Sequence, residues 1–162
     1  PLVIDLRFVA PAGVVPISAR IGPGEVLGLL GPSGSGRTAL LEAIAGARRH
    51  LGEVLVNGRP RYPRQVALAP EEPEQVLFGQ TARDAVSGDA GREMLQALGG
   101  THLLDRDWLT LSSGERRRVA LAAVLGLDRE LLLFDKPTAG LDPEGAAAFW
   151  QALRERGRPA AV

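Results

Sequence analysis

Cysteine is absent from the 162 residues, which excludes disulfide bonds and thiol catalysis and fits a reducing compartment. Lysine is nearly absent: 18 of the 19 basic residues are arginine, and Lys136 is the single lysine. Aromatic residues make up only 4% of the chain. Basic and acidic residues balance at 19 each, so the charge gives no reason to expect a nucleic acid as a partner.

Long apolar runs are also missing. The longest, residues 119–127, is much shorter than the roughly 20 residues that a membrane-spanning helix requires. No secretory leader is recognisable. We therefore expect a protein that is soluble or peripheral to a membrane, and an apolar content of 45% is enough for the core of a single domain over residues 1–162.

Strand patterns alternate with helical patterns, which predicts an α/β fold with a mainly parallel sheet. Asn57-Gly58 predicts a hairpin turn. A helical stretch with breaks at Gly88, Gly99 and Gly100 predicts a short helical subdomain inserted at about residues 80–126. The predicted strands are 2–8, 15–21, 26–30, 52–57, 66–69, 131–134 and the beginning of another at 160–162; the other predicted helices are 38–47 and 143–156.

A glycine-rich loop follows the apolar strand at 26–30 and precedes a helix. Its spacing is that of a phosphate-binding loop, in which four residues separate Gly from Gly-Lys-Ser/Thr, with Arg37 in the lysine position. Glycines allow successive N–H groups to converge on a polyphosphate, and the next helix points its positive end at the same anion. A flexible Gly/Ser turn is the alternative. The predicted ATP-binding residues are Gly31, Pro32, Ser33, Gly34, Ser35, Gly36, Arg37, Thr38 and Ala39.

Two further stretches carry a family resemblance. Leu111-Ser-Ser-Gly-Glu115 resembles the LSGGQ signature of ABC ATPases, and residues 131–142 resemble that family's Walker B strand, catalytic turn and D-loop. Residues 71–88 look like the Q-loop region of ATPases that power energy-coupling-factor importers for cobalt, nickel and vitamins. The resemblance covers residues 2–162 and implies a P-loop NTPase with an ABC-type core, including an antiparallel N-terminal β part.

The resemblance also implies a function. Such a chain is an ATP-binding subunit of a transporter on the cytoplasmic face of the membrane, joined to a transmembrane subunit and to a second ATPase in a homo- or heterodimer. Thr38, Asp135 and Glu71 would contact Mg²⁺. Ser112, Ser113, Gly114 and Glu115 would contact the ATP of the partner, although Ser112 and Glu115 could equally form only a helix capping box.

Several residues depart from the family pattern at the chain's own ATP site. Ala10 replaces an aromatic that stacks on adenine, Arg37 replaces lysine, and Glu71 replaces the Q-loop glutamine. Lys136 replaces the catalytic glutamate, and a cation cannot accept a proton from water. We expect Lys136 to pair with Asp135 or to approach the γ-phosphate.

The usual C-terminal part, with its switch histidine, would lie beyond residue 162. His50 and His102 lie upstream and are expected on the surface or in loops. The sequence therefore predicts ATP binding with impaired hydrolysis at this site. The alternatives are a non-catalytic module that dimerises on ATP without turnover, and a decayed product with little affinity for nucleotide.

Overall fold

The computed structural model describes residues 2–162, which divide into two compact units. Unit 1 consists of residues up to 68, together with 129–135 and 157–162. Unit 2 consists of residues 69–128 and 136–156. The helical subdomain predicted at about residues 80–126 is therefore only part of unit 2, which begins earlier and includes a further C-terminal helix.

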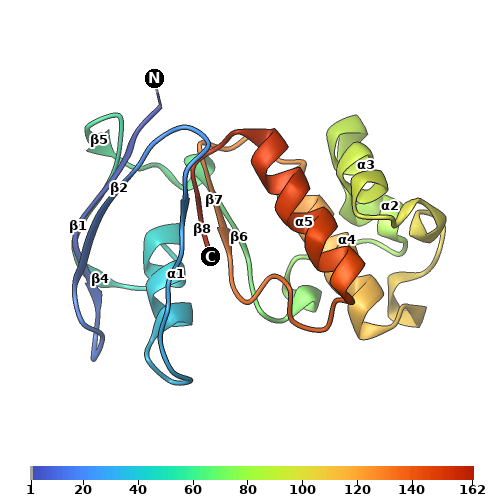
Figure 1. Cartoon of the computed structure of the whole chain (residues 1–162), viewed down its shortest axis with the longest axis horizontal. Helices are drawn as coiled ribbons and strands as arrows, with labels where there is room; N and C mark the ends of the chain where they lie inside the picture. Colours follow the sequence, from blue (N-terminus) through green and yellow to red (C-terminus); the bar gives the residue numbers. More distant parts are fainter. Residues whose placement is uncertain (1) are drawn as a thin grey trace. The chain divides into compact units, whose positions relative to one another are not determined.

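Unit 1 contains an antiparallel sheet with the strand order β2-β1-β4-β5 (Figure 1). The predicted hairpin is confirmed: Asn57 and Gly58 connect β4 to β5 and have φ values of +51° and +75°, the left-handed conformation that a tight hairpin turn requires. The second strand begins at Ile17 and not at the predicted residue 15, after a turn closed by Val14 N–H and Pro11 O. The strands are β1 (Ile4–Pro11), β2 (Ile17–Ile21), β4 (His50–Val56) and β5 (Arg59–Pro60).

A second sheet has the strand order β3-β8-β7-β6, and β8 runs parallel to both of its neighbours. All four residues of β7 are buried and apolar, as expected for a parallel strand covered on both faces. The predicted strand 26–30 is too long: β3 ends at Leu27, and Leu30 is 97% exposed where the chain leaves the sheet. The strands are β3 (Val26–Leu27), β6 (Val66–Ala69), β7 (Leu131–Phe134) and β8 (Ala160–Ala161).

Helix α1 (Arg37–Ala45) packs in unit 1 between the two sheets (Figure 1). Its buried residues, Leu40, Leu41, Ala43 and Ile44, join one core with side chains from β1, β4 and β7. Each fully buried leucine or isoleucine contributes about 1.5–3 kcal/mol to folding. This core fixes α1, and with it the end of the loop that precedes the helix.

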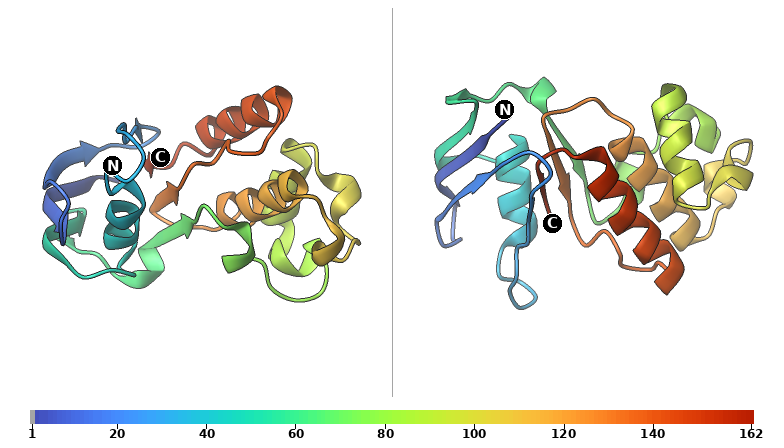
Figure 2. Two further views of the ribbon diagram at one scale, coloured as in Figure 1. Left: turned by 90° about the horizontal axis from the view of Figure 1, so that it is seen from below. Right: turned by 45° about the horizontal axis from the view of Figure 1, so that its top comes forward.

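Unit 2 is built around packed helices, of which α3, α4 and α5 contact one another (Figure 2). The predicted break at Gly88 is confirmed, because α2 ends at Ala85 and α3 begins at Gly88, which has a φ of +70°; Gly99 follows the end of α3, with a φ of +71°. Short 3-10 turns occupy 73–75, 101–103 and 108–110. The helices are α2 (Ala82–Ala85), α3 (Gly88–Ala97), α4 (Ser113–Leu125) and α5 (Pro143–Arg156).

The described helices differ from membrane spans in length and composition. The longest, α5, has 14 residues and includes Arg154, Glu155 and Arg156. Among residues 2–162, no helix combines the length and the apolar character needed to cross a bilayer.

Candidate functional site

The glycine-rich segment 31–38 follows β3 and includes the first two residues of α1, all within unit 1. Gly34 and Gly36 have φ values of +80° and +92°, where a residue with a Cβ is strained by about 1–2 kcal/mol. A Cβ on Gly36 would also lie 2.5 Å from Cγ2 of Val14. In the described part of the chain no side chain caps α1, and its first turn contains no acidic residue. The first N–H groups of the helix are therefore open to an anion.

Arg37 and Thr38 occupy the first turn of α1. The guanidinium of Arg37 donates from Nη1 to the carbonyl of Gly31, at the other end of the same loop. Arg37 is half-buried, while Thr38 is exposed. The cation that replaces the family's lysine therefore contacts the loop itself.

Asp135 directly follows the buried strand β7 in unit 1 and is only 3% exposed. Its Oδ2 is buried, and no hydrogen-bond donor from residues 2–162 reaches it. A buried carboxylate oxygen without a donor is costly unless a cation neutralises it, so this residue fits Mg²⁺. The described residues contain no group of three or more carboxylates or histidines suited to a metal ion. Mg²⁺ would then have few protein ligands, and phosphate oxygens and water would complete its coordination, as is common when it binds with nucleotides.

Lys136 does not pair with Asp135, so that prediction was wrong. Its Nζ donates to both carboxylate oxygens of Glu71, at 2.6 and 2.7 Å. Lys136 has a φ of +47°, which is uncommon for a residue with a side chain. Two positions assigned to the hydrolytic chemistry, 71 and 136, therefore carry opposite charges and bind each other within unit 2.

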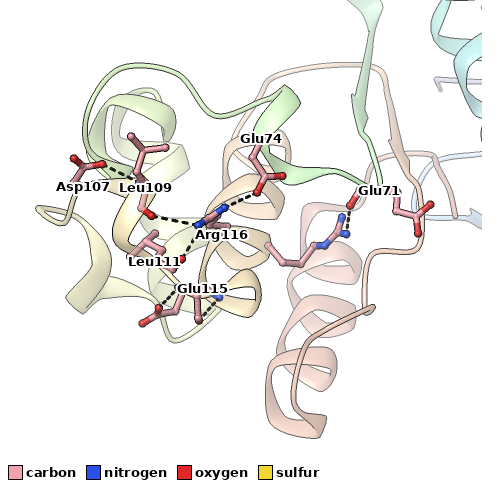
Figure 3. A network of polar contacts seen from close by, with 9 residues as sticks. Glu71, Glu74, Asp107, Leu109, Leu111, Glu115 and Arg116 are labelled. Atoms are coloured by element: carbon pink, nitrogen blue, oxygen red, sulfur yellow. Dashed lines mark hydrogen bonds and ion pairs between the residues drawn. The ribbon is translucent and has the colours of Figure 1, made fainter.

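Arg117 supports Glu71 from helix α4, and the sequence analysis assigned no role to it. Arg117 is only 6% exposed, and its Nη1 donates to the carbonyl of Pro70 at 2.9 Å. Its Nη2 donates to the carbonyl of Glu71 (Figure 3). The available signal was its place in the middle of three consecutive arginines, residues 116–118, in a helix that continues with apolar residues, because a buried cation requires acceptors. The sequence could not predict which carbonyls would accept, because they lie 46 and 47 residues away along the chain.

The signature-like segment forms the N-terminus of α4, and the capping box is confirmed. Ser112 Oγ accepts from Glu115 N at 3.3 Å, and the Glu115 carboxylate accepts from Ser112 N at 2.7 Å. The backbone bond from Ser112, the Ser112 hydroxyl and the nearby Arg106 together lower the pKa of Glu115 below its ordinary value. Glu115 is therefore a stable carboxylate that belongs to the helix cap.

Arg116 fastens the same helix to its surroundings (Figure 3). Its Nε donates to Leu111 O at 3.0 Å, its Nη2 to Leu109 O at 3.2 Å, and its Nη1 to Glu74 Oε1 at 2.8 Å. The hydrogen bond from Arg116 is the main reason that the pKa of Glu74 is lowered. One side chain thus joins α4 to the turn before it and to the segment after β6.

A surface cavity of about 500 Å³ lies at the N-terminus of α4. A Cβ on Gly114 would approach the carbonyl of Gly140 to 2.9 Å, so a glycine is needed where the two segments meet. Arg118 donates from Nη2 to both oxygens of Asp142, at 2.9 and 3.0 Å. The structure therefore brings all four signature residues together with the predicted D-loop; the cavity is lined by His102, Ser112, Ser113, Gly114, Glu115, Arg118, Gly140, Leu141 and Asp142.

The remaining predicted positions lie in the strands and turns. Ala10 is half-buried in β1, next to a bulge at which Phe8 has a φ of +51° and is 72% exposed. His50 was expected on the surface or in a loop but is the half-buried first residue of β4. His102 is exposed in a 3-10 turn, as expected.

Comparison with known proteins covers most of the chain. A family model described as ABC transporter matches residues 14–139. The chain is 31% identical to the energy-coupling factor transporter ATP-binding protein EcfA of Methanocaldococcus jannaschii, over 92% of this chain and 63% of that protein. It is 35% identical to the hemin import ATP-binding protein HmuV of Pseudomonas fluorescens, over 86% of this chain and 64% of that protein. The chain thus spans less than two thirds of the length of either relative.

A solved structure supports the same comparison at the level of the fold. The structure of an ATP-binding subunit of an ABC transporter matches with a TM-score of 0.82 and 21% identity, over 98% of this chain and 78% of that one. At this identity the likeness concerns the fold alone. The predicted α/β class, with an antiparallel N-terminal part and a mainly parallel sheet, is confirmed.

Proposed function

The chain belongs to the ABC transporter family, and from this premise we propose that it is an ATP-binding subunit whose own site hydrolyses ATP poorly. One observation carries the proposal: the ammonium of Lys136 stands where the resemblance places the catalytic glutamate, and it bonds to both oxygens of Glu71. A protonated amine cannot accept a proton from the attacking water. The carboxylate of Glu71 is occupied by the same two hydrogen bonds.

Nucleotide binding has better support than hydrolysis. We assign the phosphates to residues 31–39, through the backbone N–H groups that all of them except Pro32 carry, and to the N-terminus of α1. Thr38 Oγ1 and the unpartnered Oδ2 of Asp135 are the proposed ligands of Mg²⁺, whereas both carboxylate oxygens of Glu71 are engaged by Lys136. Bound Mg²⁺ would neutralise phosphate charge. Arg37 would assist only after leaving the Gly31 carbonyl.

The second half of the proposal concerns a partner ATPase. Ser112, Ser113, Gly114 and Glu115 would contact the nucleotide bound by that partner. The intact capping box and the cavity beside it support a usable surface there. In a heterodimer, a partner that retains the catalytic glutamate would hydrolyse ATP mainly at its own site. A homodimer would contain two impaired sites.

A transmembrane subunit completes the proposed assembly. The named relatives are ATP-binding proteins of an energy-coupling factor transporter and of a hemin importer. By analogy with them, we place this chain on the cytoplasmic face of a membrane, peripheral to the transmembrane subunit. The residues described above bind nucleotide and do not specify the transported substance.

A non-catalytic module is the second candidate function. In it, ATP would close a dimer without being consumed. Two residues favour this candidate: Arg37 keeps the charge of the lysine that it replaces but not its shape, and Lys136 stands where the catalytic base is expected.

Binding and turnover measurements separate these functions. We expect the purified chain to bind ATP in an Mg²⁺-dependent manner and to hydrolyse it only at background, with Gly36→Ala as the non-binding control. Adding a partner ATPase and transmembrane subunit should raise turnover. Turnover that stays at background favours the non-catalytic module, and absence of ATP binding indicates a decayed site. Family-typical hydrolysis by the chain alone, abolished by Lys136→Ala, would refute the proposal.

A further inference from the structure

The contact between Glu71 and Lys136 joins two segments of unit 2 that are 65 residues apart. Both Nζ–O distances, 2.6 and 2.7 Å, are short enough for two charge-assisted hydrogen bonds. The side chains are 42% and 47% exposed, so solvent reaches the pair and the charges are not trapped by burial. Lys136 is also the only lysine in the chain.

Each member of this pair is positioned by its own backbone. Buried Arg117 binds the carbonyls of Pro70 and Glu71, which fixes the main chain that carries the carboxylate. Lys136 has left-handed backbone geometry, and its carbonyl accepts from Ala139 N at 3.1 Å in the turn after β7. The two side chains therefore lie within hydrogen-bonding distance because the backbone at residues 70–71 and the turn at residues 136–139 are each fixed by their own hydrogen bonds.

From this geometry we propose that Glu71 and Lys136 act as one unit, a closed ion pair within unit 2 in which each group is held by the other and neither is free to bind another ligand. The proposal rests on the proposed function. While the pair is closed, neither oxygen of Glu71 is free to bind a metal ion, and the ammonium of Lys136 is not free to approach a phosphate.

The pair has a chemical consequence for any attempt to restore hydrolysis. Lys136→Glu alone places a second carboxylate beside Glu71, and like charges at this separation repel each other. Glu71→Gln alone leaves Lys136 unpaired and provides no base. Only the double substitution Glu71→Gln with Lys136→Glu provides a carboxylate at position 136 beside a neutral amide that can donate to it.

The first test measures the pair without nucleotide. Thermal or urea unfolding is compared for the parent, Glu71→Lys, Lys136→Glu and the charge swap that combines them. We expect the two single variants to be less stable and the swap to recover, with a coupling of up to about fivefold in the unfolding equilibrium constant. A swap whose effect equals the sum of the single effects would overturn the pairing. Glu71→Gln with Lys136→Met, which removes both charges, provides a folded comparison if a single variant unfolds.

The second test measures ATP hydrolysis, with ATP binding recorded in parallel. We expect the Glu71→Gln/Lys136→Glu variant to hydrolyse at least about tenfold faster than the parent, and Lys136→Glu alone or the charge swap to remain near the parent rate. Equal hydrolysis rates for Lys136→Glu and the double variant would contradict the proposal that Glu71 and Lys136 act as one unit. Glu74→Gln, which breaks the neighbouring pair with Arg116, is the control and should not change hydrolysis in either background.

The two proposals fail in distinguishable ways. Loss of the coupling in the unfolding experiment, which needs no ATP, contradicts the ion pair and leaves the proposed function standing. Absence of ATP binding by the parent contradicts the proposed function, while the coupling can still be observed.

Discussion

Asp135→Asn is expected to stabilise the chain in the absence of nucleotide while weakening its response to Mg²⁺. Asp135 is 3% exposed, and its Oδ2 has no donor among the described residues. An unsatisfied buried polar group costs about 1–3 kcal/mol, and a charged one costs more. Asparagine leaves a neutral, still imperfectly bonded group in the same volume, so we expect a gain of about 1–2 kcal/mol. In a chain of this size that gain raises Tm by about 2–8 °C.

With ATP and Mg²⁺ present, the parent should gain more stability than Asp135→Asn. A ligand at 100 times its Kd stabilises the folded state by about 2.7 kcal/mol, which corresponds to a rise of about 5–11 °C in the parent. The assay records Tm without ligand, with ATP and EDTA, and with ATP and Mg²⁺. If Asp135 binds the metal, the extra rise that Mg²⁺ produces in the parent should disappear in Asp135→Asn.

Asp142→Asn is the matched control. The Asp142 carboxylate is exposed and accepts from Gly145 N at 2.7 Å, the main reason that its pKa is lowered, with further bonds from Arg118. Because that carboxylate is well solvated and bonded, its substitution should lower Tm without ligand. The reasoning about Asp135 is refuted if Asp135→Asn also lowers Tm and retains the full response to Mg²⁺.

Three other predictions concern the phosphate loop and the cap of α4. Gly34→Ala should cost about 1–2 kcal/mol because of its positive φ, whereas Gly36→Ala should cost more and abolish ATP binding, since its Cβ also meets Val14; equilibrium ATP binding and Tm check both. Ser112→Ala should lower stability by about 1 kcal/mol, or Tm by about 2–4 °C, and Ser112→Thr should restore most of it. The lowered pKa of Glu115 means that its contribution is complete above its ordinary pKa of 4.5 and is lost as the pH falls through the folded-state value. Urea unfolding from pH 6 to pH 3 should therefore show a smaller loss of stability in Glu115→Gln than in the parent, and equal losses would contradict this assignment.

Much of the fold follows from local patterns in the sequence. The predicted bounds 66–69, 131–134 and 143–156 are those of β6, β7 and α5. These elements were readable because apolar runs, a proline in the first helical turn and a terminal glycine act within a few residues. The strand predicted at 26–30 was too long because leaving the sheet for the phosphate loop depends on pairing with β8, which comes from the other end of the sequence.

The sequence by itself determined the chemistry that is present: a glycine loop suited to phosphate, a carboxylate at the end of a buried strand, a capped signature helix, and a lysine where a base is expected. Each of these depends on residue types at short spacing, and short-range backbone rules are general. Only the tertiary structure decided which groups meet. It paired Lys136 with Glu71 and not with adjacent Asp135, left Asp135 Oδ2 buried without a donor, and placed Arg117 under the Glu71 backbone. These outcomes depend on the packing of segments that are distant in the sequence, because a charged side chain binds whichever acceptor the fold brings within reach.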